Sequence, residues 1–167
     1  GQSKRAMRDY EQALMLLSAF DDLETRGIVL SNAATAYIDY GDIETAESFF
    51  VESIQISQRL QDRASEAIRR GNYGWFLLST GRPRLALLTL EYAVRQSENL
   101  GLSLQAAVQT DNIGLAHDEL GSYEQASVFH AKAWEMLKAH DDTYWQGIVS
   151  ANLGHSLLSL DNDTDAE

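Results

Sequence analysis

The sequence has no cysteine among its 167 residues, which excludes a disulfide framework, a thiolate zinc site and a cysteine nucleophile. One proline and 11 glycines are too few for a collagen-like or proline-rich chain. No apolar run approaches the roughly 18 residues that a membrane-spanning helix needs. The N-terminus also lacks the apolar segment of a signal peptide. We therefore expect no membrane contact and a cytoplasmic location.

Basic side chains are also scarce. The 13 Lys and Arg stand against 25 Asp and Glu, which gives a net charge of −12. Nucleic-acid binding requires Lys and Arg to displace the counterions of phosphates. We therefore expect no direct nucleic-acid contact by this chain.

The strongest feature that is present is a pattern that recurs every 40 residues. An asparagine recurs at four equivalent positions, a glycine follows most of them nine residues later, and small residues keep the same register. The four columns are Asn32, Asn72, Asn112 and Asn152; Gly41, Gly81 and Gly121; Ala46, Ala86 and Ala126; and Ala34, Gly74, Gly114 and Gly154. Self-similarity at a fixed period predicts a repeat architecture.

Each 40-residue repeat predicts two helices. Residues 23–40 carry apolar side chains at helical spacing, and Gly41 is placed to end that helix in a left-handed conformation. Ile43, Ala46 and Phe50 then begin the apolar stripe of a second helix. The predicted fold class is all-α with about eight helices. Full repeats are expected at 23–60, 63–100 and 103–140, a second helix alone at 1–20, a first helix alone at 143–160, and an acidic tail at 161–167.

Two stretches, NYGWFLLSTGRPRLALLTLEYAV and DNIGLAHDELGSYEQASVFHAKAW, resemble tetratricopeptide (TPR) repeats. Their shared features are a small residue, an aromatic residue or leucine, a helix-ending glycine and then alanine, aromatic and alanine. The repeat of 40 rather than 34 residues is similar to that of Pins-type adaptors, Rap-type peptide sensors and maltose-regulator-type activators. The resemblance covers residues 1–160 as a single array. It implies a right-handed α-α superhelix with incomplete hairpins at both ends, whose first helices line a concave binding surface.

The asparagine column is the candidate binding feature. An amide can donate and accept hydrogen bonds at once, so a row of amides suits an extended peptide backbone. Alternatively, each asparagine bonds to a neighbouring helix and sets the stacking of the repeats. One helical turn further along each first helix lies a variable residue, and acids follow after another turn. The candidate site is Asn32, Thr35, Asp39, Asn72, Trp75, Asn112, Leu115, Glu119, Asn152 and His155.

Trp75 is the expected anchor, because tryptophan offers a large contact area with a polar group. The alternative is a tryptophan packed between hairpins. Arg69 and Arg70 are expected at the groove edge, facing an acidic end of the ligand.

No catalytic motif is present. The sequence has no P-loop, GxGxxG, GxSxG or HExxH, and no histidine pair has metal-ligand spacing on one helix. His117 and His130 occupy columns of large core residues and are expected to pack together. Asp118 and Glu119 are expected to be solvated. We therefore expect no enzymatic activity, no cofactor and no metal.

The predicted last helix carries Tyr144, Trp145, Leu157 and Leu158, more apolar surface than one neighbouring helix covers. Self-association through this helix is therefore expected.

These features predict a non-enzymatic module that binds a protein or peptide, as the sensor or scaffold segment of a larger regulatory protein. Two alternatives remain open at this stage. One is a small-ligand-sensing and self-association domain of a maltose-regulator-like transcription activator, and the other is an auxiliary domain of an enzyme.

Overall fold

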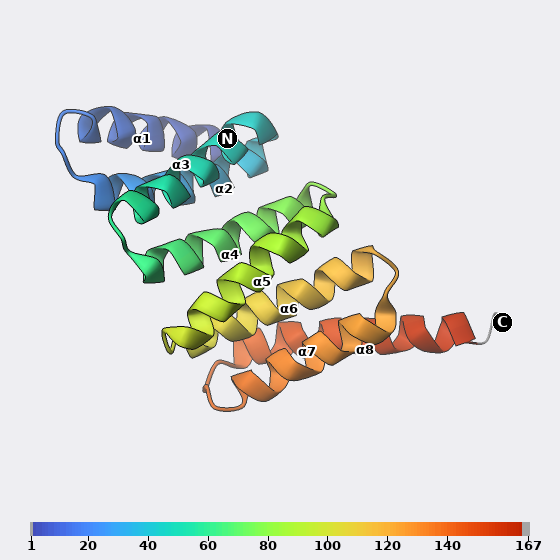
Figure 1. Ribbon diagram of the computed structural model, residues 1–167. Coiled ribbons are helices and arrows are strands. Elements are labelled where there is room, and N and C mark those ends of the chain that lie inside the picture. Colours follow the sequence, from blue (N-terminus) through green and yellow to red (C-terminus); the bar gives the residue numbers. More distant parts are fainter. Residues whose placement is uncertain (1, 165–167) are drawn as a thin grey trace. The chain divides into compact units, whose positions relative to one another are not determined.

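The computed structural model describes residues 2–164, and this part of the chain contains eight α-helices and no strand (Figure 1). The count agrees with the prediction from the repeat. The helices are α1 (Gln2–Leu17), α2 (Leu23–Tyr40), α3 (Ile43–Arg59), α4 (Arg63–Ser79), α5 (Pro83–Asn99), α6 (Ser103–Glu119), α7 (Tyr123–Leu137) and α8 (Thr143–Thr164). None of these helices is long and apolar enough to cross a bilayer.

The helix ends follow from local sequence. Asp22 and Asp42 cap α2 and α3, and their carboxylates accept hydrogen bonds from the backbone N–H groups of Thr25 and Thr45 at 3.0 and 3.1 Å. Each such cap stabilises a helix by about 1 kcal/mol. Gly41 has φ of 93° and donates its N–H to the last carbonyls of α2. Only glycine adopts this conformation without strain, which is why it recurs at this place in the repeat.

The described residues form two compact units, one that extends to Tyr73 and one that starts at Gly74, so the boundary falls within α4. In the first unit, α2 packs against both α1 and α3. Leu14, Leu30 and Ile56 bring these three helices together in one apolar cluster. The Tyr37 hydroxyl donates to Glu11 at 2.7 Å, and burial together with this carboxylate raises the pKa of Tyr37 to about 12.

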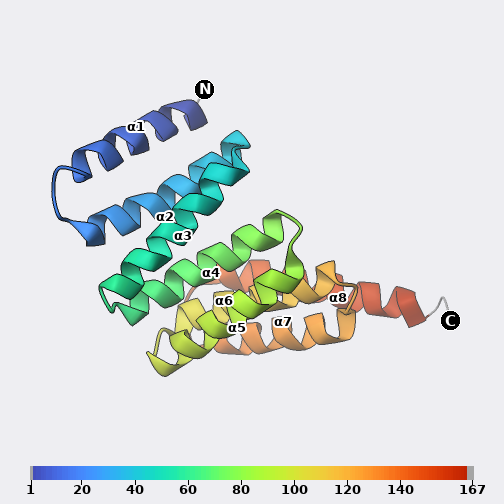
Figure 2. The same ribbon diagram turned by 45° about the horizontal axis from the view of Figure 1, so that its top comes forward.

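In the second unit, each helix from α5 to α7 packs against the next, and α8 contacts both α6 and α7 (Figures 1 and 2). A buried cluster joins α6, α7 and α8 through Ala107, Leu137 and Val149. This packing places two first helices, α6 and α8, beside each other. The prediction of helices 103–120 and 143–160 on one surface of this unit depends on that arrangement.

The small-residue columns admit bulky side chains from the second helices. A Cβ atom on Gly74 would lie 2.5 Å from side-chain carbons of Leu90, and one on Gly114 would lie 2.5 Å from the ring of His130. In both cases the partner is 16 residues later, on the second helix of the same repeat. Ala46, Ala86 and Ala126 are all fully buried as well. The columns thus encode close helix contact within each hairpin.

Candidate functional site

The ten predicted site residues all lie on the first helices of the repeats: α2, α4, α6 and α8. Most of them are exposed, and the three half-buried ones are Asn112, Leu115 and Asn152. On α6, Asn112, Leu115 and Glu119 are spaced three and four residues apart, so they share one face of that helix. On α2, Asn32, Thr35 and Asp39 have the same spacing and are exposed.

The four asparagines divide into two kinds. Asn72 lies 3.5 Å from the hydroxyl of Ser31, and Asn152 donates to the Asp111 carboxylate at 2.9 Å. In both cases the partner is 41 residues earlier, on the preceding first helix. Asn32 and Asn112 have no hydrogen-bond partner among the described residues. Two of the amides therefore make the contact between repeats that the sequence left open, and the other two are available to a ligand.

Trp75 is 41% exposed, so a large aromatic surface on α4 faces solvent. The expected position of Arg69 is wrong. Its side chain is only 5% exposed, packs against Gly27 and donates to the Ser53 carbonyl and the Ser57 hydroxyl at 2.8 and 2.6 Å. Gly27 has room for a guanidinium because it lacks a Cβ.

The expectation of a free Arg70 at the groove edge is also not met. Its Nε lies 2.9 Å from a Glu66 carboxylate oxygen one turn earlier on α4, so the two residues form an ion pair. Neither arginine supplies an unpaired cation for an acidic ligand end.

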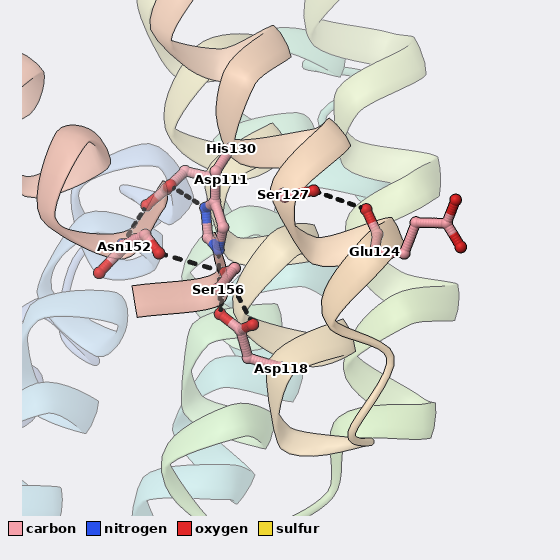
Figure 3. Close-up of polar contacts among 7 residues, drawn as sticks. All are labelled: Asp111, Asp118, Glu124, Ser127, His130, Asn152 and Ser156. Carbon is pink, nitrogen blue, oxygen red and sulfur yellow. Dashed lines mark hydrogen bonds and ion pairs between the residues drawn. The ribbon is translucent and has the colours of Figure 1, made fainter. Parts of the chain in front are cut away.

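A buried cluster of ionisable side chains lies at the junction of α6, α7 and α8 (Figure 3). His130 on α7 is fully buried between two aspartates of α6. Its Nδ1 lies 2.6 Å from Asp111 Oδ1, and its Nε2 lies 3.1 Å from Asp118 Oδ2. The side chains of the two aspartates are only 3% and 9% exposed.

Helix α8 completes this cluster with two uncharged donors (Figure 3). Asn152 Nδ2 donates to the second oxygen of Asp111. The hydroxyl of Ser156 lies 2.8 Å from Asp118 Oδ1 and donates to that carboxylate. Each aspartate is therefore shared between the histidine and α8. We call the three ionisable residues Asp111, Asp118 and His130 the α6–α7 triad.

The two carboxylates control the protonation of the triad. Burial lowers the pKa of His130, but the hydrogen bonds and negative charges of Asp111 and Asp118 outweigh it, so that this pKa lies above its ordinary value of 6.5. His117 behaves in the opposite way, because burial lowers its pKa below the ordinary value. Its ring stacks on Phe129, with centroids 5.3 Å apart.

These contacts correct two expectations from the sequence. His117 and His130 do not form a pair with each other, since one stacks on Phe129 and the other bonds to the two aspartates. Asp118 is not solvated, since its carboxylate is buried against His130 and Ser156.

The repeat contained a signal for the triad. All three of its residues replace apolar or small residues of other repeats, and all three fall in the same repeat. The counterparts are Ser31, Gly71 and Ala151 for Asp111, Ile38, Leu78 and Leu158 for Asp118, and Phe50 and Leu90 for His130.

The triad does not have the geometry of a catalytic group. Ser156 bonds to an aspartate rather than to the histidine, so no base contacts its hydroxyl. Among the described residues, no set of three or more His, Asp or Glu side chains could hold a metal ion. A shallow cavity of about 340 Å³ lies elsewhere, between α2 and α3, and Arg26 and Glu52 form an ion pair in its wall at 2.7 Å.

Gly114→Ala is expected to lower the free energy of unfolding by about 1–3 kcal/mol, because the new methyl group would overlap a histidine ring that two carboxylates hold in place. Gly154→Ala is the matched control in the same column of the repeat, and a Cβ there meets no atom within 4 Å. It should stabilise α8 by up to about 1 kcal/mol. Urea denaturation of both variants measures the difference, and equal effects would contradict the close contact at Gly114.

Three solved structures match this arrangement of helices. BtubC (BKLC) from P. vanneervenii superposes with a TM-score of 0.81 at 21% identity, over 95% of this chain and 67% of that one. The apo form of RapI gives 0.82 at 16% identity, over 96% of this chain and 45% of that one. The nearly identical TPR-like repeats assigned to a kinesin light chain of Podosopora anserina give 0.78 at 14% identity, over 99% and 82%.

The chain has a TPR-like fold. The all-α, TPR-like fold class expected from the 40-residue repeat is thus confirmed. No protein-family model and no curated protein matches the sequence. The TPR-like chain spans less than half the length of RapI.

Proposed function

We propose that this TPR-like chain is a non-enzymatic module that binds a protein or an extended peptide through the exposed faces of its first helices. The observation that carries the proposal is the unpartnered amide of Asn112, which shares a face of α6 with Leu115 and Glu119. An amide without an internal partner can bond to both an N–H and a C=O group of a peptide backbone.

The first helices alternate in kind, which supports a recognition role. Asn32 and Asn112 are unpartnered, and each is followed seven residues later by an acid, Asp39 or Glu119. Asn72 and Asn152 bond to a preceding helix, and each is followed three residues later by an aromatic ring, Trp75 or His155. Free amides with an acid and exposed rings therefore alternate along the chain. Such alternation suits a ligand that presents backbone groups and side chains in turn.

The similarity to TPR-like structures supports the wider role proposed here, that of a sensor or scaffold segment in a larger cytoplasmic regulatory protein. The chain covers 67% of BtubC and 45% of RapI, so each of those proteins continues beyond the matched part. The absence of a catalytic motif in the sequence agrees with a binding role.

The test begins with selection of peptides from a random dodecapeptide library displayed on phage, with the whole chain immobilised. Fluorescence anisotropy of a selected peptide then gives its affinity. Asn112→Ala should weaken binding about tenfold, and Trp75→Ala about thirtyfold or more, at an unchanged melting temperature.

Leu88→Ala is the control, because Leu88 is 68% exposed on the second helix α5. It should bind the peptide as the wild type does. Selected peptides that bind equally to all variants, or that bind the Leu88→Ala protein least, would contradict the proposed faces.

A further inference from the structure

The α6–α7 triad requires a proton to satisfy its hydrogen bonds. Both ring nitrogens of His130 face a carboxylate, at 2.6 Å for Asp111 and 3.1 Å for Asp118. A neutral imidazole has only one N–H donor, whereas an imidazolium has two. The observed geometry with two ionised aspartates is therefore that of the protonated ring. Loss of the proton would leave one carboxylate facing a nitrogen lone pair in a buried place.

The charged groups that face the ring are few. From α6 they are Asp111 and Asp118, and α8 contributes to the same carboxylates only the uncharged groups of Asn152 and Ser156. The charged residues of α7 itself point elsewhere, and Lys132 pairs with Glu98 of α5. No other positive charge among the described residues is in contact with either aspartate. The ring proton of His130 is thus the local counter-charge.

We propose that the α6–α7 triad is a pH-responsive latch that fastens α8 to α6 and α7. In the closed state the imidazolium orients both carboxylates so that they accept from Asn152 and Ser156. The longer bond, from Nε2 to Asp118, is the one that loses its proton when the pH rises. Asp118 then faces the lone pair of Nε2, turns away, and weakens the contact with Ser156 of α8.

The direction of the effect follows from the raised pKa of His130. A group whose pKa is higher in the folded state stabilises that state fully below its unfolded value, near 6.5, and loses this contribution as the pH rises through the folded value. The latch is therefore closed in mildly acidic solution and opens above neutrality. Because α8 also carries Asn152 and His155 of the proposed binding face, ligand affinity would follow the latch if the proposed function holds. The latch itself does not depend on that function.

Hydrogen–deuterium exchange of the whole chain without ligand tests the latch. Protection of the α8 amides, corrected for the intrinsic pH dependence of exchange, should fall by about tenfold for each unit by which the pKa of His130 exceeds 6.5. The range from about pH 5.5 to about pH 8.5 covers the titration of a histidine with a moderately raised pKa. Protection of α8 that stays constant over this range would overturn the proposal.

Asp118→Asn is the informative variant. The asparagine amide can donate to Nε2 of a neutral His130, so every group is satisfied without the extra proton. The protection of α8 should then no longer depend on pH. Glu135→Gln, at an exposed position of α7, removes an acid outside the triad and should leave the pH dependence intact. The same pH dependence in Asp118→Asn as in the wild type would overturn the latch.

An NMR titration of the His130 ring gives an independent readout on the wild-type protein, and it remains decisive if Asp118→Asn fails to fold. The ring should titrate above pH 6.5 and should retain its proton on Nδ1 in the basic form. A pKa at or below 6.5, or a proton on Nε2 in the basic form, would contradict the proposed order of events.

Discussion

His130→Leu is expected to lower the free energy of unfolding by about 3–5 kcal/mol near pH 6, because it leaves two buried aspartates without a counter-charge. The loss should exceed that expected from the change in side-chain volume, since leucine stands at the equivalent place in the preceding repeat. Urea denaturation followed by circular dichroism measures the change. A loss below about 1 kcal/mol would mean that the carboxylates find water or protons without cost.

The repeat itself supplies the matched rescue. A triple variant with Asp111→Ser, Asp118→Leu and His130→Leu carries the residues found at these places in other repeats. Serine at position 111 keeps an acceptor for Asn152, as Ser31 does for Asn72. Replacing a whole buried ion cluster by apolar groups is often neutral or stabilising. The triple variant should therefore recover most of the lost stability, and one that stays as unstable as His130→Leu would contradict the role of the charges.

Leu90→Ala is expected to cost about 2–5 kcal/mol, because Leu90 is fully buried and its side chain fills the space opposite Gly74. Leu88→Ala, two residues earlier on α5, is the control, because that side chain is 68% exposed. It should change stability by no more than about 0.5 kcal/mol. Thermal and urea unfolding of both variants give the comparison, and similar losses would show that α5 packs in a different register.

A second substitution tests the contact more closely. Gly74→Ala alone should cost about 1–3 kcal/mol, because its methyl group would overlap Leu90. In the Leu90→Ala background the same methyl group enters the vacated space. The double variant should therefore be about 1–3 kcal/mol more stable than the sum of the two single changes predicts. Additive losses would contradict a direct contact between these two positions.

The helices were predictable because their determinants are local. Gly41 ends α2 in the conformation that its lack of a side chain allows, and Asp22 and Asp42 cap helices at the expected places. The 40-residue interval then carries the same local solution along the chain. No knowledge of distant contacts is needed for this part of the prediction.

The partners of the polar side chains were less predictable, because they depend on distances between helices. Arg69 was expected at a groove edge, although its column contains Val29, Gln109 and Val149, two apolar residues and one buried glutamine. That column indicates an interior position, and Gly27 provides the space there. The direction of a long side chain is set by such room on the neighbouring helix, which the pattern of one helix does not describe.

The candidate binding residues illustrate the same limit. Their exposure follows from the periodicity of the first helices, but the partners of Asn72 and Asn152 depend on the residue 41 positions earlier. Ser31 and Asp111 are polar and can accept, whereas Gly71 and Ala151 have no polar side-chain atom. A comparison between columns, rather than within one column, would have separated the two kinds of asparagine.

Repeat proteins are commonly regarded as strings of exchangeable modules, and the bonds between the triad and α8 limit that freedom here. The hydroxyl of Ser156 has no equivalent in the other first helices, where Ala36, Phe76 and Ala116 stand. If the repeat 103–140 were moved ahead of any of those helices, Asp118 would lose its second donor and would meet a methyl group or a phenyl ring. The order of the last two repeats is therefore constrained by chemistry in the interior, and recombination that shuffles this array must move them as a pair.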